Sequence, residues 1–449
     1  MEQTRIETRL IIKHKTNSNF FLQKTEAGWS LPNINGGAER ENMVGPIQQA
    51  VWEQLQLNVW IGRKLLEKKV EAQNTKVEFY EAELHREQNI KSGFKWGDKE
   101  DIVDSIIDED EIKAIGINLI DESEILEKRA PWFRKGWYDN AERWIISVVN
   151  RNQYFIKGSI EQVKVSDLSI ILRVPIVNGV LYFKGTGPAS RYESKLSQHL
   201  DTIHQGKTVN ILDINEKEGW LLMWELGGGS LRQIRDKHVW KTAINEYANL
   251  QVTEIYYIDT LISLGLPDRR LHILKNDIEK HLTGMCATGL DEETTVKVMA
   301  LKPELLKMCD EMEGIVPYSI DHGDLHSANI HLVGDEIVFF DWGDATITHP
   351  FFSTRVFWHS LDDLVASESE WLDMVNEFRP HYIEPWTRFA PIHELERLLL
   401  LSDQLSCVYR ALSWYLYITP SRENVDDSFR KPSQWLQVLL EHRELIGVK

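Results

Sequence analysis

"SIDHGDLHSANIHLVGDEIVFFDWGDA", residues 319–345, is the stretch that decides the fold predicted from this sequence. It surrounds two apolar runs with aspartates, histidines and one asparagine. Carboxylates beside apolar sequence are costly to ionise unless a cation or hydrogen-bond donors compensate them. The stretch therefore indicates a site that holds a cation rather than a plain piece of core.

The two apolar runs are predicted to form strands joined by the turn VGDE, residues 333–336. Such a hairpin brings Asn329, before the first strand, and Asp341, after the second, to the same end. Asp324 precedes Asn329 and adds a further carboxylate there. Carboxylate and amide oxygens suit Mg²⁺, which commonly binds one or two carboxylates together with substrate phosphates.

The order H-G-D-x-H-x-x-N, an apolar strand and then D-W resembles the aminoglycoside phosphotransferase / choline kinase family, whose members are distant relatives of protein kinases. The resemblance implies transfer of the γ-phosphoryl group of ATP or GTP to a hydroxyl of a small molecule. It also implies roles for matching residues. Asp324 corresponds to the catalytic aspartate, and Asn329 and Asp341 correspond to the two ligands of Mg²⁺.

The segments that precede this stretch fit the same family pattern. Lys184 ends the strand GVLYFK, and Glu193 follows in the next helix, as in the Lys–Glu pair that steadies the nucleotide phosphates of kinases. Alone, Lys184 would be read as a solvated strand-end lysine. Its position before LLMWELGGGSL favours the nucleotide role, because that segment resembles the family hinge. The backbone there is expected to meet the adenine edge, through Met223, Trp224, Glu225 and Leu226.

Three features depart from the pattern or compete with it. The expected phosphate-covering turn, residues 163–169, contains no glycine, so a plain turn is the simpler interpretation. Ser353 stands where the family often has an aspartate that anchors the following helix. The run KGTGPAS after a strand imitates a dinucleotide-binding turn, but no acidic residue follows at the required distance, and the flanking turns predict an antiparallel sheet.

Composition narrows the function classes. Lys and Arg number 51 against 69 Asp and Glu, a net charge of −18, which disfavours binding to nucleic-acid phosphates and tolerates cationic ligands. No run of apolar residues is long enough to predict a membrane span. Three scattered cysteines without metal-ligand spacing are typical of a reducing compartment, so a cytoplasmic location is expected.

The whole chain of 449 residues is too long for one ordinary domain. The expected fold class is α+β: a protein-kinase-like bilobal domain preceded by a small mixed α/β domain. The small antiparallel β lobe is expected over 137–226, and the large helical lobe with the catalytic loop and acceptor site over 227–449. The preceding domain is expected over 1–130.

The first domain resembles a degenerate Nudix module in the stretch from GWSLPNINGG to VWEQLQLNV. A working Nudix helix needs several carboxylates to collect Mg²⁺ around a diphosphate, and here Glu53 is alone. Hydrolysis by this domain is therefore not expected, and an unrelated α/β cap is the alternative interpretation.

The sequence thus predicts a small-molecule kinase, with an aminoglycoside-type antibiotic as one candidate acceptor. The alternatives are a metabolic kinase for choline, an amino alcohol or a sugar, and a non-catalytic nucleotide-binding protein on the same fold. The stretch FWHSLDDLVASESEW, residues 357–371, is the candidate acceptor site. Its acids and aromatics suit a cationic acceptor, although an amphipathic helix with a solvated acidic face has the same pattern. Neither the acceptor nor the oligomeric state can be predicted from the residues.

Overall fold

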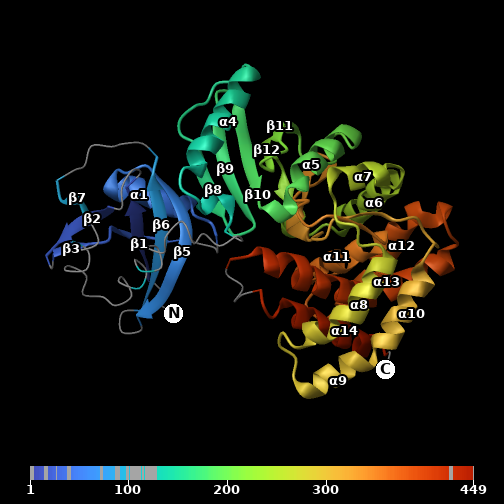
Figure 1. The fold of residues 1–449 in the computed structure, drawn as a ribbon. Helices are drawn as coiled ribbons and strands as arrows, with labels where there is room; N and C mark the ends of the chain where they lie inside the picture. Colours follow the sequence, from blue (N-terminus) through green and yellow to red (C-terminus); the bar gives the residue numbers. More distant parts are fainter. Residues whose placement is uncertain are drawn as a thin grey trace. The chain divides into compact units, whose positions relative to one another are not determined.

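The structure is a computed structural model that describes residues 5–14, 19–26, 28–37, 42–70, 74–85, 92–97, 101, 113, 116, 129–423 and 428–447. The chain divides into two compact units, Met1–Gly187 and Pro188–Lys449. β-Strands dominate the first unit and helices the second (Figure 1). The α+β class expected from the sequence is therefore confirmed, whereas the domain limits near 130 and 226 stay predictions.

A seven-stranded mixed sheet forms the first part of the N-terminal unit. Its central path runs β3-β2-β1-β6-β5, with β1 and β6 parallel, while β4 pairs with β1 and β7 with β2. Alternating apolar residues of these strands are buried, as expected for a sheet with a packed face. The strands are β1 Arg5–Lys13, β2 Phe20–Thr25, β3 Gly28–Ser30, β4 Asn33–Asn35, β5 Val59–Val70, β6 Thr75–Leu84 and β7 Phe94–Gly97.

Helix α1, Gly45–Leu55, is the counterpart of the predicted Nudix helix. It buries Ile47, Val51 and Leu55 on one face. Glu53 lies on the exposed face, where its carboxylate accepts a hydrogen bond of 2.7 Å from Gln49. Part of the resembling stretch, residues 38–41, lies outside the described residues. The Nudix resemblance stays a prediction.

The rest of the N-terminal unit is an antiparallel meander covered by a helix. Strands β8 Glu161–Val165, β9 Ser169–Ile176 and β10 Gly179–Thr186 pair in sequence, and α4, Trp137–Arg151, packs its rings on Phe183 of β10. The turn between β8 and β9 is held by Ser166, whose hydroxyl accepts from the amides of Leu168 and Ser169. That arrangement is a plain polar turn.

The C-terminal unit begins with helix α5, Tyr192–Ile203, and the hairpin of β11, Ile211–Asn215, with β12, Trp220–Trp224. A small sheet in the order β13-β15-β16 and the pair β14–β17 follow among the helices. Gly228 has φ +73°, and a Cβ there would lie 1.9 Å from the Leu332 carbonyl oxygen. Only glycine fits this turn, which leads from the hinge segment to β13. These strands are β13 Gly229–Ser230, β14 Ser319–Asp321, β15 Ile330–Val333, β16 Glu336–Phe339 and β17 Thr346–Thr348.

Helices form most of this unit and share one apolar core (Figure 1). Helix α6 begins at Lys237, where the Asp236 side chain caps the first turn at the amide of His238. Helices α9 and α10 are separate, and Pro303 lies in the first turn of α10. The helices are α6 Lys237–Glu254, α7 Ile258–Leu264, α8 Leu271–Cys286, α9 Glu292–Ala300, α10 Lys302–Met312, α11 Thr354–Ser360, α12 Glu368–Ile383, α13 Ile392–Ser413 and α14 Lys431–Leu445.

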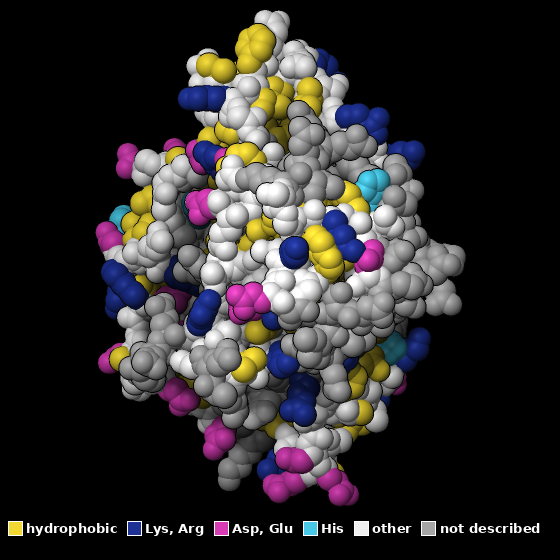
Figure 2. Space-filling model, turned by 90° about the vertical axis from the view of Figure 1, so that its left-hand side faces the viewer, with side chains coloured by type: hydrophobic (Ala, Val, Ile, Leu, Met, Phe, Trp, Pro, Cys, Tyr) yellow, Lys and Arg dark blue, Asp and Glu magenta, His cyan; other side chains and the backbone are white. Residues whose placement is uncertain are grey.

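Lys and Arg side chains are interspersed with Asp and Glu on the face shown in Figure 2, without one large area of positive charge. Within the described part of the chain, no helix is both long and apolar enough to cross a bilayer.

Candidate active site

The predicted hairpin is formed, and its register brings the two proposed metal ligands together. Ile330 of β15 pairs with Phe339 of β16, and the Phe340 amide donates to the Asn329 carbonyl at 3.2 Å. Asn329 and Asp341 therefore flank the same end of the hairpin. Asp341 has φ +67°, a left-handed conformation that is uncommon outside glycine and often accompanies functional sites.

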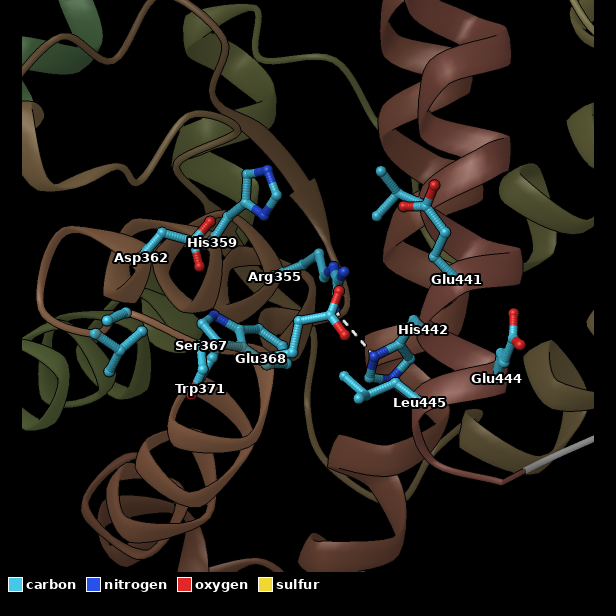
Figure 3. Close-up of a pocket in the computed structure, with 13 residues that line it drawn as sticks. Arg355, His359, Asp362, Ser367, Glu368, Trp371, Glu441, His442, Glu444 and Leu445 are labelled. Atoms are coloured by element: carbon cyan, nitrogen blue, oxygen red, sulfur yellow. Dashed lines mark hydrogen bonds between the residues drawn. The ribbon is translucent and has the colours of Figure 1, made fainter.

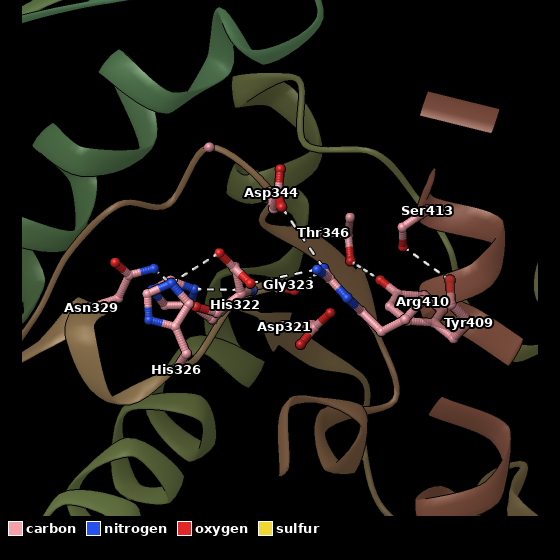
Figure 4. A network of polar contacts seen from close by, with 12 residues as sticks. Asp321, His322, Gly323, His326, Asn329, Asp344, Thr346, Tyr409, Arg410 and Ser413 are labelled. Carbon is pink, nitrogen blue, oxygen red and sulfur yellow. Dashed lines mark hydrogen bonds and ion pairs between the residues drawn. The ribbon is translucent and has the colours of Figure 1, made fainter. Parts of the chain in front are cut away.

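The loop before β15 carries Asp324, whose carboxylate has two basic neighbours, His326 and Arg410. Figure 4 labels both of these neighbours. His326 Nε2 lies 3.4 Å from one oxygen, and Nη2 of Arg410, from α13, lies 3.5 Å from the other. Arg410 also donates to the Gly323 carbonyl and lies 3.8 Å from Asp344. Burial alone would raise the pKa of Asp324, but the His326 hydrogen bond and the Arg410 charge outweigh it and lower this pKa. The carboxylate is therefore ionised at neutral pH.

His322 is buried and holds the loop through hydrogen bonds at both of its ring nitrogens. Its Nδ1 accepts from the Asp324 amide at 3.3 Å, and its Nε2 lies 3.0 Å from the Phe340 carbonyl, to which it donates. The ring lies 4.4 Å from that of Trp342. Burial lowers the pKa of His322, so the imidazole is neutral and spans the two segments that carry Asp324 and Asp341.

Gly323 is required by the contact between these segments. Its φ is +75°, and a Cβ there would lie 2.1 Å from the backbone oxygen of Asp344. We expect Gly323→Ala to lower the free energy of unfolding by about 2 kcal/mol or more, because left-handed strain and a backbone clash add. Urea denaturation of the purified variant measures this change.

The matched control is Gly334→Ala in the turn between β15 and β16. Gly334 also has a positive φ, +63°, but a Cβ there meets nothing within 4 Å. It should cost only the strain, about 1 kcal/mol. Equal losses in the two variants would contradict the close contact at Gly323.

The hydroxyl of Ser353 is hydrogen-bonded to a carboxylate from another element. Ser353 Oγ donates to Asp321, which lies buried in β14, and Tyr247 Oη lies 2.7 Å from the same hydroxyl. The Tyr247 hydroxyl in turn accepts from the His322 amide at 3.0 Å. The buried carboxylate that meets the Ser353 hydroxyl therefore comes from Asp321, on another element.

The other predicted nucleotide residues lie on three elements. Lys184 is buried in β10 of the first unit, and Glu193 is buried in the first turn of α5 in the second. A Cβ on Gly343 would lie 3.1 Å from the Glu193 carboxylate and 3.9 Å from that of Asp341, so Glu193 borders the proposed metal segment. The pairing of Lys184 with Glu193 stays a prediction.

The predicted hinge residues end β12 and continue beyond it. Met223 and Trp224 belong to the strand and are half-buried, Glu225 is exposed and Leu226 is half-buried. The Trp224 amide donates to the Asn210 carbonyl at 3.0 Å. Their contact with a nucleotide stays a prediction.

The residues at the hairpin end fit a Mg²⁺ site that the substrate completes. Nδ2 of Asn329 donates to the Asp324 carbonyl at 3.0 Å. The amide oxygen of Asn329 points away from this bond and is available as a metal ligand. Asp341 is exposed. Among the described residues, no group of three or more His, Cys, Asp or Glu could hold a metal without help. One carboxylate and one amide oxygen match a cation that draws its other ligands from phosphates and water.

The candidate acceptor segment lines a cavity of about 690 Å³ (Figure 3). The loop and the segment are joined through Ser327, whose amide donates to Ser360 at 2.9 Å and whose hydroxyl donates to Asp363 at 2.8 Å. Trp358 is wholly buried in the core and is not part of the cavity. The cavity is lined by residues of α11, by the segment that follows it, by the start of α12 and by the C-terminal half of α14. Its walls include Asp362, Glu368 and Trp371.

Sequence reasoning missed Arg410, because it lies far along the chain from the motif. A signal was present: a single arginine interrupts the apolar run CVYRALSWY. A charged residue inside a buried helix face needs a partner, but the sequence does not say which partner. Packing of α13 brings Arg410 to its partner, Asp324.

Comparison with known proteins gives one kind of match. No protein-family model matches the chain, and a search of curated proteins found no match. Among solved structures, a choline kinase from Cryptosporidium parvum Iowa II is 15% identical, with 68% of this chain and 96% of that chain covered at a TM-score of 0.47. An ethanolamine kinase from Plasmodium vivax is 15% identical, with coverage of 71% and 92% and a TM-score of 0.48.

A macrolide 2′-phosphotransferase from Brachybacterium faecium is 12% identical, with coverage of 66% and 97% and a TM-score of 0.45. All three are small-molecule kinases by name, the group that the catalytic segment resembles. With TM-scores below 0.5, these likenesses do not decide the activity, which has to be argued from the geometry of the loop and the hairpin.

Proposed function

We propose that the chain is a small-molecule kinase, which transfers the γ-phosphoryl group of ATP or GTP to a hydroxyl group. The observation that carries the proposal is the register of β15 with β16. It sets Asn329 and Asp341 at one end of the hairpin, beside the loop in which Asp324 is kept ionised.

In the proposed step, the acceptor hydroxyl oxygen attacks the γ-phosphorus while the bond from that phosphorus to the bridging β-γ oxygen breaks. Asp324 receives the hydroxyl proton, and the nucleoside diphosphate leaves. Mg²⁺ held by Asn329 and Asp341 would neutralise charge on the β- and γ-phosphates. Arg410 and His326 keep Asp324 oriented and ionised, so that the base is ready before the acceptor arrives.

The nucleotide side of the proposal uses the hinge and the Lys–Glu pair. Glu225 and Leu226 follow the end of β12, and their backbone amides donate to none of the described residues. These amides are therefore available to the edge of an adenine or guanine base. Glu193 is buried beside Gly343, where an ionised carboxylate needs a cation, and Lys184 is the proposed one. These residues are compatible with either ATP or GTP as the phosphoryl donor.

The test is binding followed by turnover. Full-length chain should melt at a higher temperature with Mg²⁺ and a non-hydrolysable ATP or GTP analogue than with either alone. Release of ADP or GDP is then measured against aminoglycosides, choline, ethanolamine, sugars and hydroxy amino acids. Absence of a Mg²⁺-dependent shift with both nucleotides would contradict the proposal and favour a protein without kinase activity.

A further inference from the structure

The cavity lined by α11, α12 and α14 contains a charge that the proposed chemistry does not use. Arg355, on α11, lines the cavity and is only 4% exposed. No ion pair formed by the described residues includes it. Its Nη1 donates to His442 Nδ1 at 3.3 Å, its Nε has no hydrogen-bond partner, and its guanidinium lies 5.8 Å from the Trp371 ring (Figure 3).

Other buried arginines of this unit are compensated. Arg443 has Glu304 at 2.9 Å, and Arg410 has Asp324 at 3.5 Å. Arg269 stacks 3.8 Å over the ring of a tyrosine and donates to a backbone carbonyl and a serine hydroxyl. A buried guanidinium without an ion pair is costly. Arg269 and Arg355 both lack one, but of these two only Arg355 also has an Nε without a hydrogen-bond partner among the described residues, so Arg355 calls for an explanation.

The groups in direct contact with Arg355 are neutral, and the carboxylate on which its charge acts, Asp362 in the cavity wall, forms no ion pair with it. An arginine can only donate, so His442 Nδ1 must accept and the proton of that ring lies on Nε2. Burial, together with the charge of Arg355, lowers the pKa of His442 to about 4, so the ring is neutral at pH 7. Burial likewise raises the pKa of the Cys407 thiol near Arg355, which keeps it neutral.

The remainder of the cavity wall has the opposite character. Asp362, Glu368, Glu441 and Glu444 line it and are exposed, and none of them forms an ion pair with Arg355. Carboxylates around the opening repel a polyanion such as a sugar bisphosphate and favour an ammonium group. The cavity therefore pairs a buried cation with acidic walls.

We propose that this cavity binds the phosphoryl acceptor, and that the acceptor is a zwitterion whose carboxylate pairs with Arg355. The proposal rests on the proposed kinase function and deepens it. The acceptor is then a hydroxylated amino acid: its carboxylate meets the guanidinium, its ammonium group the acidic wall, and its hydroxyl the catalytic loop that Ser327 joins to this wall. A cation without an acidic group, such as choline, offers Arg355 no carboxylate to pair with.

Calorimetry on the full chain with Mg²⁺ and a non-hydrolysable ATP analogue tests the proposal. The probes are serine, homoserine and hydroxylysine, compared with ethanolamine, choline and kanamycin, which lack a carboxylate. We expect at least one amino acid probe to bind, and Arg355→Met to weaken its binding about 100-fold or more, because a buried charge pair is lost. Arg355→Lys keeps the charge and should lose less. Nucleotide affinity should stay unchanged in both variants.

Stability measurements separate a ligand site from a structural arginine. Arg355→Met removes a buried charge that has no ion pair, so the variant should unfold at the same denaturant concentration as the parent chain or a higher one. Arg397→Met, at an arginine exposed on α13 and paired with Glu311, is the control and should leave acceptor binding unchanged. Destabilisation by Arg355→Met without a change in acceptor binding would overturn the proposal.

The remaining outcomes distinguish this proposal from the kinase assignment. Binding of none of the carboxylate probes, or equal binding of the probes without a carboxylate, overturns the acceptor class even if phosphoryl transfer is observed. Arg355-dependent binding of an amino acid without transfer from either nucleotide supports the site and contradicts the kinase function.

Discussion

Replacing Asp341 with alanine should abolish phosphoryl transfer, whereas Asp324→Asn should leave a trace of it. Asp341 is the proposed carboxylate ligand of Mg²⁺, so its loss should remove the metal that would neutralise the transferring phosphoryl group. The transition state is largely dissociative, and charge neutralisation therefore contributes more than deprotonation of the acceptor. We expect kcat to fall by more than about 10⁴-fold in Asp341→Ala and by about 10²–10⁴-fold in Asp324→Asn.

Coupled-enzyme detection of the nucleoside diphosphate measures both losses, and a thermal shift with nucleotide reports the metal separately. Mg²⁺ should still enhance nucleotide binding in Asp324→Asn and should no longer do so in Asp341→Ala. Asp335→Ala is the control, because Asp335 is exposed in the turn at the opposite end of the same hairpin. Equal and mild losses in the two site variants would contradict the assigned roles.

The second large effect is expected at Arg410, a positioning residue that sequence reasoning missed. Arg410→Gln removes the charge beside Asp324 and the donor to the Gly323 carbonyl. We expect kcat to fall about 100-fold, with the KM for nucleotide little changed. The pKa of Asp324 should rise, because the Arg410 charge is one of the interactions that lower it. The acid limb of the pH–rate profile should therefore move to higher pH.

Arg443→Gln is the control for the loss of a buried arginine. Arg443 pairs with Glu304 away from the catalytic loop, so its variant should lose stability while the pH–rate profile keeps its position. Arg410→Lys should recover part of kcat, since it restores a charge without the forked geometry. If Arg410→Gln only lowered stability, with an unchanged profile, Arg410 would be structural.

Much of the site could be predicted because it lies within one short stretch. The turn after Val333 and the alternation of apolar residues fix a hairpin, and a hairpin fixes which residues share an end. Asn329 and Asp341 meet for that reason alone. His322 and Gly323 belong to the same local arrangement, in which ring and glycine let the Asp324 segment lie against the one that follows β16.

The sequence by itself determined the α+β class and the grouping of Asn329 with Asp341, since both follow from local periodicity and from a turn only a few residues long. Only the tertiary structure decided which distant charges meet. Arg410 reaches the catalytic loop, Asp321 takes the place of an anchoring carboxylate at Ser353, and Arg355 is buried against a neutral histidine. An arginine in an apolar helix indicates that it needs a partner. Which residue becomes that partner depends on helix packing, for which the sequence contains no comparable local rule.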